Sequence, residues 1–273
     1  MKKSVLFTLA IAFLLFAGCQ RKQPPPLTGG RWIDLSHDFS AETIYWPTAT
    51  PFKLDTVFAG KTPKGYYYSA YQFSAAEHGG THIDAPVHFA EGMTTVDRIP
   101  LSQLIRPAIV VDVRDSAAAN RDYRVTVNDF QRWEKQHGRI PEGAIVLLRT
   151  GFGKFWPDKE RYMGTAERGE AAVPKLHFPG LHPDAAKWLT TERTISAIGL
   201  DTPSIDYGQS QLFRSHRILF AGNVPAFENV ANLNQLPAIG AWVIALPMKI
   251  RGGSGGPLRI VAFLPRPGSG SNF

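Results

Sequence analysis

The chain has 273 residues, of which 44% are hydrophobic and 19% charged, and its formal net charge is +7. This balance is typical of a folded globular protein and excludes a disordered or fibrous chain. The basic residues are scattered and form no run interleaved with aromatics, so we predict that the protein does not bind nucleic acid.

Residues 1–18 have the pattern of a signal peptide. Lys2 and Lys3 precede an apolar run over residues 5–16, which is too short to span a bilayer comfortably as a helix. The following Phe16-Ala-Gly-Cys19 resembles a bacterial lipoprotein cleavage box, in which the cysteine becomes the lipid-bearing first residue. An ordinary cleaved signal, with Cys19 a bystander, is the alternative. We therefore expect an exported protein attached to a membrane through an N-terminal lipid anchor.

Residues 19–30 are predicted to be the lipidated cysteine and a linker rich in proline and glycine, and Gln20, in place of an aspartate, favours the outer membrane, facing the periplasm. Residues 31–264 are long enough to form one domain with a sizeable core, without a disulfide, because Cys19 is the sole cysteine. Residues 265–273 lack an apolar period and are predicted to be a flexible tail.

The domain is predicted to contain many short strands and few helices. Apolar runs predict strands at residues 67–73, 109–113, 144–148, 195–200, 218–220, 242–246 and 258–263. One helix is expected from Thr126 or Asn128 to Gln136, ending near Gly138. Another is expected from about residue 182 to residue 190, with Pro183 in its first turn. These elements predict an α/β domain with much β structure.

The run His78-Gly-Gly-Thr-His82-Ile-Asp84-Ala-Pro-Val-His88 places three histidines and one aspartate in eleven residues. Imidazole and carboxylate groups are ligands that divalent zinc, manganese and iron prefer. The glycines and proline of the run oppose a helix, and its β-branched residues favour an extended chain. We predict a glycine-bent loop that enters a short strand, in which His82 and Asp84 share a face.

The alternative for this run is a solvated loop of unrelated polar residues. Its apolar residues, among them Ile83, Val87 and Phe89, favour burial, and buried histidines and carboxylates need a partner, which a metal supplies.

Four further features lie outside this run. His216 lies in the polar run Arg214–Arg217 and, judged alone, is expected at the surface. Glu228 has mostly apolar neighbours in the sequence, which predicts a buried carboxylate with a cation partner. The run Asp201–Asp206 is read as a turn held by side-chain hydrogen bonds, with support of a metal ligand as the alternative. The run Gly252–Gly256 is read as a bend before a strand, because it lacks the lysine of a phosphate-binding loop.

The run from His78 to His88 resembles the HxGTHxDxPxH signature of the cyclase-like metal-dependent hydrolases, a family that includes bacterial kynurenine formamidase and isatin hydrolase. Every fixed position of that signature is present. The resemblance extends from about residue 32 to residue 264, through the segments 34–37, 45–47, 148–151, 199–206 and 228–233. It implies a single domain of the swivelling β/β/α type, with a mixed β-sheet and few helices.

The resemblance also implies a site for one or two divalent ions, zinc or manganese. His78, His82 and Asp84 would hold one ion, and Asp84 and Glu228 would bridge to a second, with His216 as its other ligand. His88 would transfer protons. Trp46 would stack on the ring of the substrate, with ordinary packing as the alternative.

The function implied by the resemblance is metal-dependent hydrolysis of a carbon–nitrogen bond in a small amide. The first expectation is an aryl formamide such as N-formylkynurenine, and the alternative is opening of a cyclic amide such as isatin. An alternative from another class is a non-catalytic lipoprotein that binds a metal or a small ligand. The resemblance further implies a homo-oligomer, most simply a dimer.

Overall fold

The computed structural model describes residues 27–266. The expected signal peptide, Cys19 and most of the linker lie outside the described residues, as does most of the expected tail. Between residues 27 and 266, no helix combines the length and the hydropathy needed to cross a membrane.

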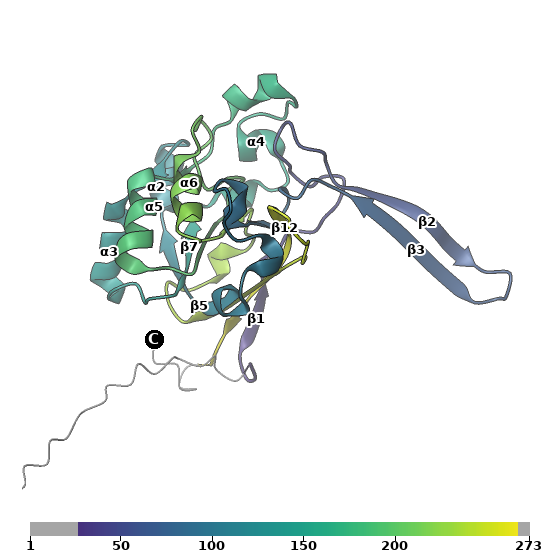
Figure 1. Ribbon diagram of the computed structural model, residues 1–273, viewed down its shortest axis with the longest axis horizontal. Helices are drawn as coiled ribbons and strands as arrows, with labels where there is room; N and C mark the ends of the chain where they lie inside the picture. The colour runs from purple at the N-terminus through teal and green to yellow at the C-terminus, as the bar shows by residue number, and fades with distance from the viewer. Residues whose placement is uncertain (1–26, 267–273) are drawn as a thin grey trace, which may run out of the picture.

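A mixed β-sheet forms the centre of the domain (Figure 1). Its strand order is β1-β12-β11-β5-β7-β9-β10-β4, and β12 also pairs with β4, so that seven strands close into a barrel and β1 lies outside the closure. Strands β5, β7, β9 and β10 are parallel neighbours, and the other pairings are antiparallel. The strands are β1 (Arg31–Asp34), β4 (His82–Asp84), β5 (Ile105–Asp112), β7 (Ile145–Arg149), β9 (Ala197–Leu200), β10 (Ala226–Glu228), β11 (Ala241–Pro247) and β12 (Gly255–Leu264).

Two smaller strand pairs complete the β structure. A long hairpin consists of β2 (Lys53–Lys61) and β3 (Tyr67–Ser74), and a short parallel pair consists of β6 (Arg124–Val125) and β8 (Gly180–Leu181).

The helices are short, and α3, α5 and α6 lie together on one side of the sheet (Figure 1). The α-helices are α1 (Leu101–Leu104), α2 (Arg114–Ala119), α3 (Val127–His137), α4 (Lys159–Met163), α5 (Pro183–Trp188) and α6 (Arg214–Ala221). Short 3-10 turns occur at Pro86–His88, Val96–Arg98, Phe152–Phe155, Glu170–Lys175 and Leu233–Gln235, and a π turn at Leu189–Arg193.

The core has two parts because the central strands are buried on both faces. In β7, Ile145 and Leu147 belong to the cluster inside the barrel, whereas Val146 and Leu148 belong to the cluster beneath the helices. This two-sided burial explains the unbroken apolar runs of these strands. The expected single α/β domain with a mixed sheet and few helices is confirmed.

Most predicted elements are confirmed with shifted ends, but the strand expected at residues 218–220 is wrong. That segment is the last part of α6. A three-residue apolar run is compatible with either a buried strand or the buried side of a helix, and its length cannot separate the two. The helix expected near residue 126 is α3, where the Asp129 carboxylate accepts a hydrogen bond from the Thr126 backbone N–H at 2.7 Å.

Candidate metal centre

Strand β4 carries the first two candidate ligands on one face. Gly80 has a φ of +57°, a left-handed conformation that suits glycine, and it turns the chain just before the strand. Because alternate side chains of a strand share a face, His82 and Asp84 point together while Ile83 packs inside the barrel. His82 Nε2 lies 3.1 Å from Asp84 Oδ1. The predicted glycine-bent loop and short strand are confirmed.

Strand β10 places Glu228 beside this pair. Glu228 lies directly opposite His82 in the antiparallel pairing of β10 with β4, so the two side chains share a face. Glu228 Oε2 lies 3.4 Å from His82 Nε2, and Glu228 Oε1 accepts a hydrogen bond from the Ile205 backbone N–H at 2.7 Å. The side chains of Asp84 and Glu228 are both buried. Two neighbouring strands of the barrel therefore bring two carboxylates into one buried site, on the face opposite Ile83 and Phe227.

His216 lies on the buried side of helix α6, and the surface position suggested by its local sequence is wrong. The neighbouring Arg214 and Arg217 are exposed, while His216 faces inward with Phe220. This is the amphipathic pattern of a helix, which a run of four polar residues does not reveal. His216 Nε2 lies 3.1 Å from Glu228 Oε1 and 3.3 Å from Asp84 Oδ2.

Asp206 holds His216 from behind. Its Oδ2 accepts hydrogen bonds from His216 Nδ1 at 2.7 Å and from the His216 backbone N–H at 3.1 Å. Asp206 therefore positions the imidazole of His216, and it also accepts hydrogen bonds from the Ser210 hydroxyl and the Ser215 backbone N–H, as the turn interpretation predicts. Asp201 does hold a loop, because it accepts hydrogen bonds from the Thr150 backbone N–H and hydroxyl at 2.8 and 2.7 Å.

His78 approaches the same carboxylate from the loop before the glycine bend. Its Nδ1 lies 2.6 Å from Asp84 Oδ1, and its Nε2 lies 2.9 Å from the Ser254 hydroxyl, which donates to Glu77 at 2.6 Å. A Cβ on Gly255 would lie 2.6 Å from His78 Cε1, so the imidazole occupies the space of a missing side chain. The glycine run that was interpreted as a bend is also a wall of the site.

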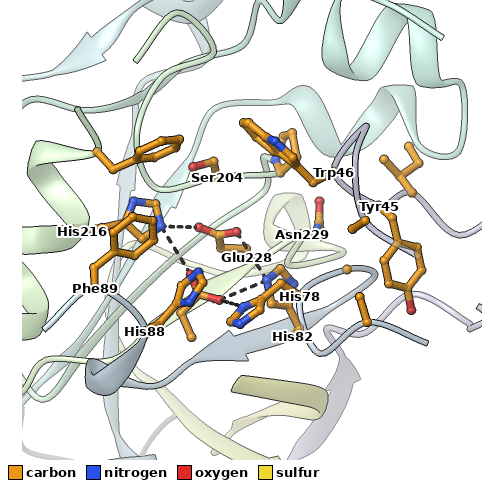
Figure 2. A pocket seen from close by; sticks show the side chains of 17 residues that line it. Tyr45, Trp46, His78, His82, His88, Phe89, Ser204, His216, Glu228 and Asn229 are labelled. Atoms are coloured by element: carbon orange, nitrogen blue, oxygen red, sulfur yellow. Dashed lines mark hydrogen bonds and ion pairs between the residues drawn. The ribbon is translucent and has the colours of Figure 1, made fainter. Parts of the chain in front are cut away.

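The imidazoles of His78, His82 and His216 lie around the buried carboxylates (Figure 2). In each ring, one nitrogen is hydrogen-bonded to a group outside the cluster. This group is Ser254 for His78 and Asp206 for His216, and for His82 it is the Gly80 carbonyl, at 3.0 Å. Each ring turns its other nitrogen toward the buried carboxylates. Outer partners that fix the ring and free one nitrogen are characteristic of metal-binding histidines.

The charges of the cluster show that it needs added positive charge. Burial opposes a charge on His82, but the Asp84 and Glu228 carboxylates outweigh burial and raise the pKa of His82 to about 9. Burial likewise opposes a charge on His216, yet hydrogen bonds to Asp206 and Asp84 raise its pKa well above the usual value. Burial and the Asp84 charge raise the pKa of Glu228. Without a metal, the cluster therefore retains protons at neutral pH.

The residues present fit a bound cation. His82 Nε2 is buried and has no hydrogen-bond partner among the described residues, although two carboxylates face it. Ligand atoms of two groups of three residues each lie within 4.8 Å of one another, and the groups are His78, His82, Asp84 and Asp84, His216, Glu228. Asp84 belongs to both groups, an arrangement suited to one ion or to two. The mixed nitrogen and oxygen donors do not select between zinc and manganese.

His88 lies beside the cluster and belongs to neither ligand group. It ends the turn Pro86–His88, and its ring stacks on that of His78, with centroids 3.8 Å apart and planes at 17°. Burial lowers the pKa of His88 to about 4, against the opposing effect of Asp84. His88 is therefore neutral at pH 7 in the metal-free protein.

The cluster lies at one wall of a cavity of about 260 Å³ whose remaining walls are largely apolar. Tyr45, Trp46, Phe89 and Phe213 are aromatic residues of these walls (Figure 2). Trp46 meets Phe213 edge-on at 6.3 Å, so one ring both packs and faces the cavity. Sequence reasoning missed Phe89 and Phe213, and no pattern in the chain distinguishes them from core residues.

Comparison with known proteins agrees with this geometry. The Cyclase family model matches residues 33–207. The chain belongs to the cyclase family. It is 31% identical over 245 residues to an isatin hydrolase of Roseibium aggregatum, a match that covers 82% of this chain and 90% of the relative. It is 27% identical over 231 residues to a kynurenine formamidase of Bacillus anthracis, covering 85% and 96%.

The similarity between this chain and isatin hydrolases is also seen in a solved structure. Isatin hydrolase A from Ralstonia solanacearum superimposes with a TM-score of 0.78 and 34% identity, over 86% of this chain and 92% of that one. The resemblance stated from the signature is therefore confirmed along the whole domain.

Asp206→Asn is expected to weaken metal binding by about 10- to 100-fold, because the neutral amide orients His216 but no longer makes its ring a stronger donor. The measurement is a competition titration against a chelator of known affinity. Ser210→Ala is the matched control, since Ser210 contacts Asp206 at 3.3 Å and is not hydrogen-bonded to His216. Unchanged affinity in the Asp206 variant would remove its proposed role.

Metal affinity is expected to rise with pH. A ligand histidine must be neutral, and His82 carries a proton below about pH 9 in the metal-free protein. Displacement of the His82 proton makes the affinity increase about tenfold per pH unit between about pH 6 and about pH 8, and this contribution levels off above about pH 9. Calorimetry in buffers with different ionisation enthalpies counts the released protons, and affinity independent of pH would contradict this account.

Proposed function

We propose that this protein is a metal-dependent hydrolase that cleaves the carbon–nitrogen bond of a small aromatic amide. The observation that most supports this proposal is the buried cluster of imidazoles and carboxylates at the wall of an aromatic cavity. His88 lies next to this cluster and outside the ligand groups. A protein that only binds a metal has no need for a neutral histidine in that place, so the non-catalytic alternative has less support.

The ligands in this proposal are His78, His82, Asp84, His216 and Glu228. A divalent metal held by them would lower the pKa of a water molecule and polarise the amide carbonyl. His88 would accept a proton as water attacks the carbonyl carbon, and would return it to the nitrogen as the carbon–nitrogen bond breaks, because its ring stacks on His78 and belongs to neither ligand group. Trp46 and Phe213 flank a planar substrate ring and exclude bulk water from the reacting bond.

The cavity favours a neutral ring amide over a formamide that carries an amino-acid group. None of the described residues that line the cavity is a lysine or an arginine. The carboxylate of N-formylkynurenine would therefore lack a cationic partner at these walls. A cyclic amide such as isatin has no charged group, and its bicyclic ring suits a cavity of about 260 Å³. The similarity to isatin hydrolases supports the same choice.

Hydrolysis of an aryl formamide remains the second candidate. Its support is the similarity to kynurenine formamidases, which extends over 84–85% of this chain and 96% of each relative. The two candidates share the same cluster and the same role for His88.

The proposed place of action rests on the sequence of residues 1–30, most of which lie outside the described part of the chain. We propose export as a lipoprotein anchored through Cys19, with the domain in the periplasm at the outer membrane, on the basis of residues 1–30 alone. Mass spectrometry of the protein purified from membranes would detect the acyl chains, and an unmodified or absent cysteine would refute the anchor.

The purified protein is expected to hydrolyse isatin faster than N-formylkynurenine, and a chelator should abolish the reaction. His88→Ala should lower kcat at least about 100-fold while metal content stays at the level of the wild type. Asp84→Ala should lose the metal, because two ligand groups share this carboxylate. Absorbance assays and elemental analysis on the same samples separate the two effects.

The matched control is His137→Ala, which changes an exposed histidine far from the cluster and should leave turnover and metal content unchanged. An active His88 variant, or a His88 variant without metal, would remove its role in proton transfer. A fully metallated Asp84 variant would refute its role as a ligand.

A further inference from the structure

The hydroxyl of Ser204 lies at the wall of the cavity and has no part in the metal cluster. Ser204 is only 5% exposed, and Figure 2 shows it between Trp46 and His216. Within residues 27–266, no group forms a hydrogen bond with this hydroxyl, although the Ser204 backbone carbonyl accepts one. Buried polar groups are nearly always hydrogen-bonded, so the hydroxyl requires a partner that enters the cavity.

The backbone around Ser204 is fixed without the help of its side chain. The Thr202 hydroxyl donates a hydrogen bond to the Ser204 carbonyl at 3.1 Å. On the other side, the Ile205 backbone N–H donates to Glu228 Oε1 at 2.7 Å. The segment is thus tied directly to the cluster, and the position of the free hydroxyl is set before any ligand binds. Groups held in this way bind a ligand at a lower cost in ordering.

Other neutral polar groups at the cavity walls are engaged or turned away. The Asn229 amide donates to the Gly80 carbonyl at 2.7 Å and accepts from the Tyr162 hydroxyl at 2.9 Å. The Tyr45 hydroxyl points away from the cluster in Figure 2. Of the two hydroxyls carried by the described residues that line the cavity, the one on Ser204 is therefore available to a ligand beside the cluster.

Ser204 and His88 lie at different ends of the cluster. The ring of His88 stacks on that of His78, with centroids 3.8 Å apart. Ser204 lies on the other side of the Glu228 carboxylate in Figure 2, next to the residue whose backbone N–H binds that carboxylate. A substrate that places its amide nitrogen near His88 would therefore direct toward Ser204 the group bonded to the other side of its scissile carbonyl.

We propose that the Ser204 hydroxyl donates a hydrogen bond to a second carbonyl that is bonded directly to the scissile one. This inference rests on the proposed amide hydrolysis and makes Ser204 a specificity residue for α-keto amides. Isatin has such a second carbonyl, whereas the formyl carbon of N-formylkynurenine carries only a hydrogen in that place. A site built to bind a polar group of the substrate discriminates strongly against an analogue that lacks the group.

The test compares isatin with 2-oxindole, which has the same bicyclic ring and amide but no second carbonyl. Binding to the metal-loaded protein is followed by quenching of tryptophan fluorescence, with stopped-flow mixing so that isatin is observed before turnover. Ser204→Ala should weaken the binding of isatin about 10-fold and change that of 2-oxindole less than about twofold, because only isatin loses a hydrogen bond. The value of kcat/KM for isatin should fall by at least the same factor.

The matched control is Ser196→Ala, which removes the hydroxyl of another buried serine, 8% exposed, that does not line the cavity. It should leave the affinities for both ligands unchanged. If Ser204→Ala fails to fold, Ser204→Cys takes its place, because a thiol of similar size is a weaker donor and should also weaken isatin binding selectively.

Equal weakening of both ligands by Ser204→Ala would indicate a packing role and overturn the proposal, as would unchanged binding of isatin. A wild type that binds isatin no more tightly than 2-oxindole would also overturn it. Because fluorescence reports binding and not turnover, isatin that binds selectively without being hydrolysed would contradict the proposed function and leave the role of Ser204 in recognition supported.

Discussion

Two carboxylates, Asp84 and Glu228, are buried side by side, and the rest of the site is arranged around their negative charge. Enclosing two like charges costs several kcal/mol unless cations compensate them. Three imidazoles face them, each hydrogen-bonded to a group outside the cluster, and the two carboxylates raise the pKa of His82 to about 9. A divalent ion supplies that positive charge more compactly than protons do. The need to balance the two buried carboxylates therefore explains why the fold places imidazoles around them.

Closure of the barrel brings these groups together. Strand β4 pairs with β10 on one side and with β12 on the other, so Glu228 and Gly255 flank the strand that carries His82 and Asp84. The missing side chain at Gly255 leaves room for His78.

The part of the site that lies in one short segment of the chain could be predicted from the sequence. Spacing and residue type were sufficient to predict that His82 and Asp84 share a face of a short strand. The position of His216 was not predictable from its neighbours, because the exposed Arg214 and Arg217 hide the buried side of a helix. Asp206 and Ser254 acquire their roles only through contacts between distant segments. Likewise, the apolar pattern of β3 predicts a strand but cannot show that one chain leaves that strand uncovered.

The central claim is that the buried carboxylates hold a divalent metal together with imidazoles. X-ray absorption spectroscopy at the metal edge, combined with elemental analysis of the protein as purified, tests it most directly. The account predicts one or two divalent ions per chain in a shell of mixed nitrogen and oxygen donors, with the metal lost on treatment with a chelator. A protein that remains metal-free in the presence of zinc and manganese, or a metal without imidazole ligands, would contradict it.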